Sequence, residues 1–168
     1  MYRIALALFA LLLTACERPA EPVAWRNPAA MISSAALFDP TRFQGEWEVV
    51  ATYGPEGDCG PLRESWAVEA GRFAVRGNVC GRSGKAGYAT KAQMIGPGRI
   101  ARPMPAGPEE IWVLWVDADY RVAAIGTPSG QFGRIIARPG QARADLLTAA
   151  RSVLDFNGYD LNKLRMLR

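Results

Sequence analysis

Between residues 46 and 137 the chain alternates short apolar runs with clusters of Gly, Pro, Asn and Asp, the pattern of antiparallel strands joined by turns. The eight runs lie at residues 46–53, 62–68, 72–79, 88–95, 99–104, 111–116, 121–126 and 131–137. A meander of eight strands that closes on itself leaves no free sheet edge. The pattern therefore predicts an all-β fold, an eight-stranded up-and-down antiparallel β-barrel.

The hydrophobic period becomes helical after Pro139-Gly140, which predicts one α-helix packed outside the barrel. The apolar stripe of this helix consists of Leu146, Leu147, Ala150, Val153 and Leu154. Asn157-Gly158 is a plausible helix stop, and residues 161–167 are expected to form a short final strand. The run at 111–116 is apolar on both faces, so we expect it under this helix or in the most enclosed part of the sheet.

The N-terminus has the features of an export signal. Arg3 precedes the apolar run Ile4–Leu13, which is too short for a membrane-spanning helix but typical of a cleaved secretory signal. The following Leu13-Thr14-Ala15-Cys16 resembles the lipobox of bacterial lipoproteins, which implies that the Cys16 sulfur is acylated. Glu17 follows, and not the Asp that often retains lipoproteins in the inner membrane. These residues favour a lipid anchor in the outer membrane of a Gram-negative bacterium, with the protein facing the periplasm.

The chain then divides into three parts. Residues 1–15 are expected to be the cleaved signal peptide, and residues 16–36, rich in Pro and Ala, the lipidated N-terminus and a tether. Residues 37–168 are expected to form one folded domain, since their length suits a single core.

Charge and composition argue against several classes of function. The net charge of +4 is scattered among acids and turns, so nucleic-acid binding has little support. The chain has no His, which removes Ser–His catalysis, the usual haem ligand and the usual zinc ligands. We therefore expect no enzyme activity, no cofactor and no metal.

Two cysteines remain once Cys16 is assigned to the lipid. Cys59 and Cys80 form an even pair in an oxidising compartment, and we expect a disulfide between them. They lie in the loops after the first and third predicted strands, which open at the same end of a meander. The disulfide should therefore restrain one rim of the barrel.

Three motifs in order make the chain resemble a lipocalin, specifically the bacterial outer-membrane lipoprotein branch of that family. The motifs are Phe43-Gln44-Gly45-Glu46-Trp47, Asp117-Ala118-Asp119-Tyr120-Arg121 and Phe132-Gly133-Arg134-Ile135-Ile136-Ala137-Arg138-Pro139. The resemblance implies that one end of the barrel is closed by Gly45, Trp47, Asp119, Tyr120 and Arg138, with Arg138 packed over Trp47. Gly133 and Arg134 depart from the family, where larger apolar residues are usual.

The resemblance also implies a small hydrophobic ligand, such as a fatty acid or lysophospholipid, and a role in lipid handling or envelope maintenance. Inward-facing candidates for ligand contact are Val49, Ala51, Tyr53, Trp66, Trp112 and Leu114. The two-sided apolar strands do not show which face is interior, and ordinary core packing is the favoured explanation for each of these residues. The alternative function is a lipoprotein inhibitor of an exported enzyme, of the protease or lysozyme type, acting through loops at 80–85 and 103–110.

Overall fold

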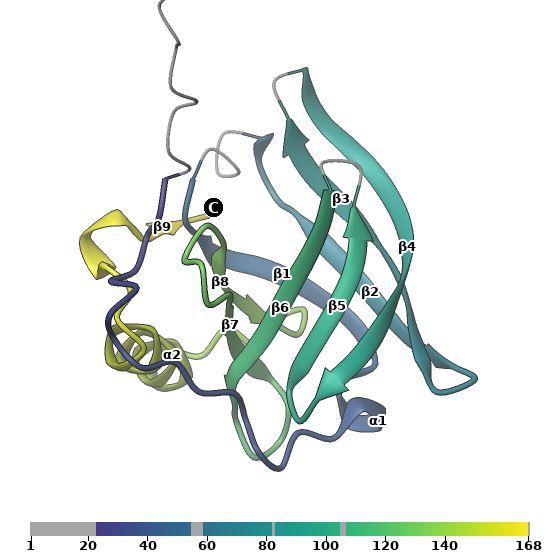
Figure 1. Cartoon of the computed structure of the whole chain (residues 1–168). Coiled ribbons are helices and arrows are strands. Elements are labelled where there is room, and N and C mark those ends of the chain that lie inside the picture. Colours follow the sequence, from purple (N-terminus) through teal and green to yellow (C-terminus); the bar gives the residue numbers. More distant parts are fainter. Residues whose placement is uncertain (1–22, 55–58, 82, 105–106, 168) are drawn as a thin grey trace, which may run out of the picture.

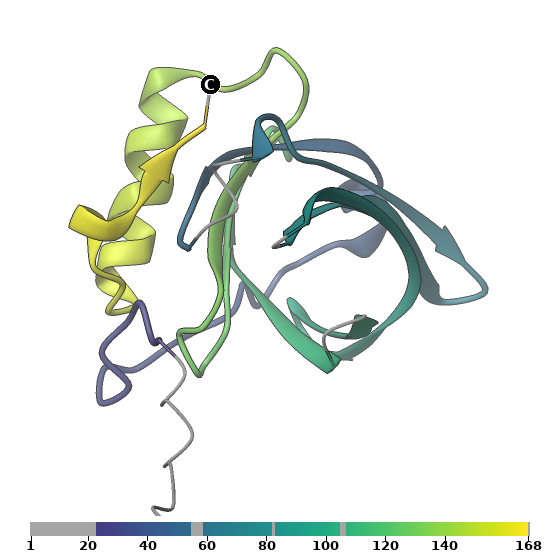
Figure 2. The same ribbon diagram turned by 90° about the horizontal axis from the view of Figure 1, so that it is seen from above.

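The computed structural model describes residues 23–54, 59–81, 83–104 and 107–167. Within these residues, consecutive strands pair antiparallel into a ring, which β1 closes by pairing with both β2 and β8 (Figures 1 and 2). The strands are β1 (Gly45–Thr52), β2 (Arg63–Glu69), β3 (Arg72–Gly81), β4 (Gly84–Gly96), β5 (Arg99–Met104), β6 (Gly107–Val116), β7 (Val122–Gly126) and β8 (Gly133–Ala137). The predicted eight-stranded up-and-down barrel is confirmed.

One end of the barrel is closed by the residues that lead into β1. Asp39 caps the short helix α1 (Pro40–Phe43) by accepting from the backbone N–H of Thr41. The rings of Phe43 and Trp47 stack with centroids 4.7 Å apart, and both side chains are buried. The loops after β1, β3, β5 and β7 lie at the opposite end, called the mouth here.

The helix α2 (Ala144–Phe156) lies against the outside of the barrel, as predicted (Figure 2). Ala150 and Leu154 are fully buried against the outer faces of β6, β7 and β8, whereas Leu146, Leu147 and Val153 are only partly buried. The helix ends at Asn157, and Gly158 follows with φ +84°, in agreement with the predicted stop.

The predicted final strand at 161–167 is wrong over most of its length. Asp160 accepts from the backbone N–H of Asn162 and starts a 3-10 helix, η2 (Leu161–Lys163). Only the two-residue strand β9 (Arg165–Met166) follows, paired with β1 outside the ring. The side-chain cap competes with strand pairing, so the local turn prevails over the extended form.

Residues 23–39 form an N-terminal strap that runs along the outside of the barrel from the mouth to the closed end (Figure 1). Its Trp25 N–H donates to the Gly130 carbonyl at the mouth over 2.7 Å, and its Ala35 N–H donates to the Val113 carbonyl, also over 2.7 Å. Arg26 is buried and donates to the carbonyls of Asn157, Pro128 and Ala30. The part of the expected tether from residue 23 onward is thus bound to the barrel, and the folded domain begins before Leu37.

None of the helices in the described ranges has the length and apolar character needed to cross a membrane.

Candidate ligand-binding site

The lower barrel interior, next to the closed end, is filled by side chains. Trp66 meets Phe73 edge to face at 5.2 Å and Phe43 at 5.4 Å. These rings join one buried cluster with aliphatic residues from around the ring, namely Val49, Val75, Ile100, Ile111, Val113, Ile125 and Ile136. Any ligand site within the barrel must therefore lie above this core, toward the mouth.

A buried ionic network crosses the interior above the aromatic core. The Glu64 Oε1 atom accepts from the Tyr88 hydroxyl at 2.7 Å, from Arg134 at 3.0 Å and from Arg102 at 3.2 Å. Its Oε2 atom accepts from the Trp66 indole N–H at 3.1 Å. The side chains of Glu64, Arg102 and Arg134 are at most 2% exposed. Such charges are tolerated in the interior only because each is paired and hydrogen-bonded.

The pairing sets the ionisation of these groups. Burial alone would raise the pKa of Glu64, but Arg102, Arg134 and the hydrogen bonds of Tyr88 and Trp66 outweigh it and lower that pKa to about 2. Burial and the neighbouring Glu64 carboxylate both raise the pKa of the Tyr88 phenol. Burial would lower the pKa of Arg102, but Glu64 and Glu109 raise it above its ordinary value. At neutral pH the network is therefore fully charged around a neutral Tyr88.

Above the network lies the mouth pocket, with a volume of about 510 Å³. It is lined by Val79, Cys80, Gly81, Met104, Gly107, Pro108, Glu109, Glu110, Thr127, Ser129, Gln131 and Phe132. Glu109 links the pocket to the network, because its carboxylate accepts from the buried Arg102 Nε at 2.7 Å. The pocket thus has a mixed apolar and polar wall above a charged floor.

The predicted disulfide between Cys59 and Cys80 is present at this rim, with the two Cα atoms 5.6 Å apart. It joins the loop after β1 to the end of β3. Because Cys80 itself lines the mouth pocket, the disulfide fixes part of the pocket wall.

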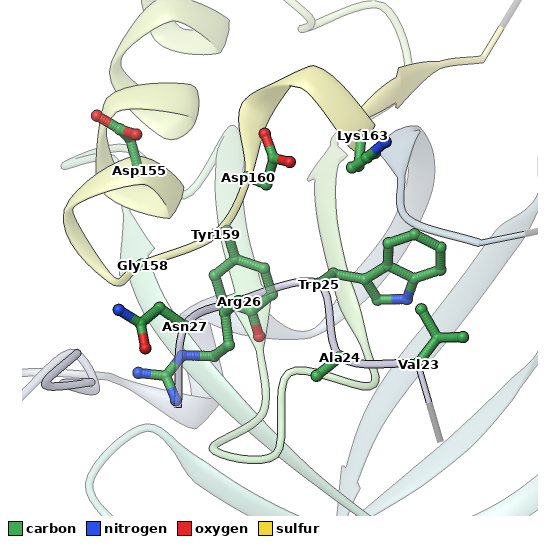
Figure 3. Close-up of a pocket in the computed structure, with 10 residues that line it drawn as sticks. All are labelled: Val23, Ala24, Trp25, Arg26, Asn27, Asp155, Gly158, Tyr159, Asp160 and Lys163. Carbon is green, nitrogen blue, oxygen red and sulfur yellow. The ribbon is translucent and has the colours of Figure 1, made fainter. Parts of the chain in front are cut away.

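A second pocket, of about 410 Å³, lies outside the barrel between the strap and the C-terminal segment (Figure 3). Trp25, Asp160 and Lys163 are among its lining residues. Trp25 also stacks on Tyr53, with the ring centroids 6.0 Å apart. The Tyr53 hydroxyl is buried without a hydrogen-bond partner among the described residues, and burial raises the pKa of this phenol.

Of the six residues predicted to contact a ligand, two face the barrel interior and four lie on its outer face. Val49 and Trp66 face the interior, within the buried core below the mouth pocket. The expectation that Ala51 and Tyr53 also face inward is wrong, because both belong to the cluster between the barrel and α2. The register between β1 and β8 shifts between Val49 and Ala51, and this bulge turns the following side chains to the other face.

Trp112 and Leu114 also lie on the outer face, contrary to the expectation. On β6 the inward residues are Ile111 and Val113, so the alternation sends Trp112 and Leu114 outward. Leu114 is covered by α2, and the ring of Trp112 lies 4.0 Å from the Arg99 guanidinium. The strand is apolar on both faces because the helix buries its outer face.

At the closed end, the predicted stacking of Arg138 over Trp47 is confirmed, with 3.9 Å between the guanidinium carbon and the ring centroid. Arg138 also donates to the carbonyls of Arg42, Glu46 and Tyr120. Gly45 has φ +107°, and a Cβ there would lie 2.8 Å from the Arg138 Nη1 atom. The glycine thus makes room for the arginine.

The turn before β7 is ordered by Asp117 and not by the predicted Asp119. The Asp117 carboxylate accepts from the backbone N–H groups of Arg121 and Val122. Although its partial burial raises its pKa, these hydrogen bonds lower it overall. The Asp119 side chain is 67% exposed and forms an ion pair with Arg121, and its backbone N–H is a further donor to the Asp117 carboxylate. Tyr120, with φ +58°, accepts from the Asp39 N–H through its hydroxyl and so joins the strap to the turn.

The ionic network is the part of the site that the sequence pattern did not reveal. Glu64 and Arg102 lie in the short predicted strands at 62–68 and 99–104, where the pattern singled out neither residue. One signal was available, since Arg134 is the charged residue within the otherwise apolar strand β8. A lone arginine within a buried strand indicates a buried anion nearby.

Comparison with known proteins identifies the family to which the chain belongs. A family model described as "Lipocalin-like domain" matches residues 74–168, more than half of the chain. The protein belongs to the lipocalin family. Temperature-induced lipocalin-1 of Arabidopsis thaliana is 29% identical to this lipocalin over 130 residues, which cover 74% of this chain and 68% of the plant protein.

Solved structures support the same fold. Lipocalin 12 from rat epididymis has a TM-score of 0.61 at 16% identity and covers 81% of this lipocalin and 88% of its own chain. Lobster apocrustacyanin A1 has a TM-score of 0.59 at 12% identity, covering 75% and 77%. The siderocalin Ex-FABP, described as acting through dual ligand specificities, has a TM-score of 0.57 at 15% identity, covering 75% and 93%. At such identities the likeness concerns the fold alone.

The family and fold favour ligand carriage over catalysis, because lipocalins are mainly carriers of small hydrophobic ligands. In the part of this lipocalin that the structure describes, no three acidic or cysteine side chains gather closely enough to hold a metal ion.

Proposed function

We propose that this lipocalin is an acylated protein of the bacterial outer membrane and carries a small amphiphilic ligand in the mouth pocket. The observation that carries the proposal is the pocket of about 510 Å³ above a filled barrel. This volume lies within the usual range of small-molecule sites, roughly 300–1,000 Å³. Val79, Met104 and Phe132 offer apolar surface, and Thr127 and Gln131 offer hydrogen-bonding groups.

The filled interior limits how the ligand lies. A long acyl chain cannot run down the barrel axis, because the Glu64 network and the rings below it occupy that space. The ligand therefore places a short or bent apolar segment against the pocket wall. The head group of a fatty acid or lysophospholipid stays at the rim, because Glu109 is already paired with the buried Arg102 and a charged head group loses its hydration on burial.

The proposed location of the protein in the outer membrane rests on the N-terminal sequence. Cys16 at the end of a lipobox-like segment, followed by Glu17, supports acylation and sorting to the outer membrane. Replacing Cys16 by Ser should move the protein from the membrane fraction to the soluble fraction. If the C16S protein stays with the membranes, the anchor is assigned wrongly.

The ligand proposal is tested with gently purified C16S protein. Native mass spectrometry should show a bound lipid of fixed mass, and calorimetry should show binding of added fatty acid or lysophospholipid. Gln131→Phe fills the mouth pocket and should weaken this binding at least tenfold. Gln141→Phe makes the same change at an exposed position beyond β8 and should leave it unchanged.

Two results would contradict the proposed site. One is a protein that binds none of these lipids, and the other is binding that Q131F and wild type share equally.

A further inference from the structure

We propose that the mouth of the barrel faces the membrane to which the chain is anchored, so that the pocket opens onto the lipid surface. The inference rests on the proposed acylation of Cys16. Its structural basis is the position of the N-terminal end of the strap. Val23 and Trp25 lie at the mouth, where the Trp25 N–H donates to Gly130 in the β7–β8 loop and Trp25 shares a surface pocket with Gly54 at the end of β1.

The length of chain between anchor and barrel restricts the orientation. Seven residue steps separate Cys16 from Val23, and they span at most about 25 Å when fully extended. The ten residues of β6 span about 33 Å along the strand, and a strand tilt of about 40° makes the barrel roughly 25 Å tall. The linking residues would therefore reach the closed end only if they were fully extended along the whole barrel, whereas the mouth lies close to the anchor at any extension.

The chemistry of the mouth end suits a lipid surface. Lys163 and Arg165 border the same surface pocket as Trp25, and Lys85 lies at the start of β4 beside the mouth. Val23 is 62% exposed and Met166 is 49% exposed. Figure 3 shows the Trp25 ring beside Val23 and Lys163. Basic groups attracted by anionic head groups, together with a tryptophan and exposed apolar side chains, are typical of surfaces that rest on membranes.

Of the two described acids that line the mouth pocket, Glu109 is balanced by its ion pair with the buried Arg102. Glu110 accepts from the Trp112 indole N–H and keeps its negative charge. With the mouth held at the lipid surface, an amphiphile reaches the pocket directly from the bilayer. Its apolar segment then avoids a passage through water, which is unfavourable in proportion to the apolar surface exposed.

The experiment uses the full acylated protein in vesicles of phosphatidylethanolamine and phosphatidylglycerol that carry nitroxide-labelled head groups. Because Cys59 and Cys80 form a disulfide and Cys16 is acylated, one introduced cysteine takes a fluorescent label selectively. Ser129→Cys places the label at the mouth. Matched controls are Asp119→Cys at the closed end and Thr148→Cys on the exposed side of α2.

The nitroxide should quench the label at position 129 several-fold more strongly than the labels at 119 and 148. Strongest quenching at 119, strongest quenching at 148, or equally weak quenching at all three would overturn the proposed orientation. Co-sedimentation with the vesicles is measured separately. A protein that does not sediment with them refutes the anchor itself, whereas one that sediments with the wrong quenching pattern refutes only the orientation.

Discussion

Replacing Glu64 by Gln tests the account of the barrel interior. The substitution keeps the volume of the side chain but removes the negative charge that Arg102 and Arg134 share. Arg102 then keeps the partly exposed Glu109 as an anionic partner, and Arg134 loses its ion pair with Glu64. Removing one partner of a buried ion pair costs about 3–5 kcal/mol, because the remaining charge is left desolvated. We expect E64Q to lose stability in this range at pH 7.

The pH dependence gives an independent measure of the same interaction. The pKa of Glu64 falls from 4.5 to about 2 on folding, which corresponds to about 3 kcal/mol of stability. Because the folded pKa is lowered, this stability is fully present above pH 4.5 and is lost as the pH falls toward 2. The stability difference between wild type and E64Q should shrink by about 2 kcal/mol between pH 7 and pH 3.

Urea unfolding of the C16S protein and its E64Q variant, followed by Trp fluorescence from pH 7 to pH 3, measures both effects. The matched control is Glu48→Gln, since Glu48 forms a solvent-accessible ion pair with Arg63 at 2.7 Å. A pair of this kind contributes at most about 1 kcal/mol, so E48Q should lose no more than that at pH 7. Equal losses in E64Q and E48Q, or a difference between E64Q and wild type that is the same at every pH, would refute the interpretation.

Three further predictions concern stability and use the same unfolding assay. Tyr159→Phe should lower the free energy of unfolding by about 1–3 kcal/mol, because the Tyr159 hydroxyl donates to two carbonyls and accepts from one backbone N–H. Tyr53→Phe should be neutral or stabilising, because the Tyr53 hydroxyl has no hydrogen-bond partner among the described residues. Equal effects of the two substitutions would contradict this assignment. Arg138→Lys should cost about 1–2 kcal/mol by removing the guanidinium stacked on Trp47, and an unchanged midpoint would argue against closure by this contact. Replacing both cysteines of the disulfide by serine should cost about 3 kcal/mol, given a sequence separation of 21, and full stability without the disulfide would show that it does not restrain the unfolded chain.

The overall architecture could be predicted from the sequence because period-two alternation and turn residues are local properties. All eight strands and the helix were placed by this pattern, with errors mainly at the ends. The longer β3–β4 hairpin and the earlier start of β6 depend on cross-strand pairing of residues such as Lys85 and Pro108, which have little strand preference of their own.

Which residues line the barrel interior was harder to predict from the sequence, for two physical reasons. A single-residue bulge after Val49 changes which face Ala51 occupies, and no local signal in β1 marks it. The helix α2 covers one side of the barrel, so apolar outward residues such as Leu114 look the same as inward ones. Glu64 and Arg102 were missed because their burial depends on partners 38 residues apart in sequence, which a local pattern does not contain.

The strap also determines how mechanical load would enter the protein. The Trp25 carbonyl accepts from the Asp160 N–H, and the Asn27 N–H donates to the Gly158 carbonyl, so the two ends of the described chain are tied to each other. A force applied through a membrane anchor acts first on these bonds and on the buried Arg26. The strands of the barrel carry tension only after the strap has separated from them. The strap is therefore the part of the molecule that we expect to yield first under load, resisted by its backbone hydrogen bonds and by the buried Arg26.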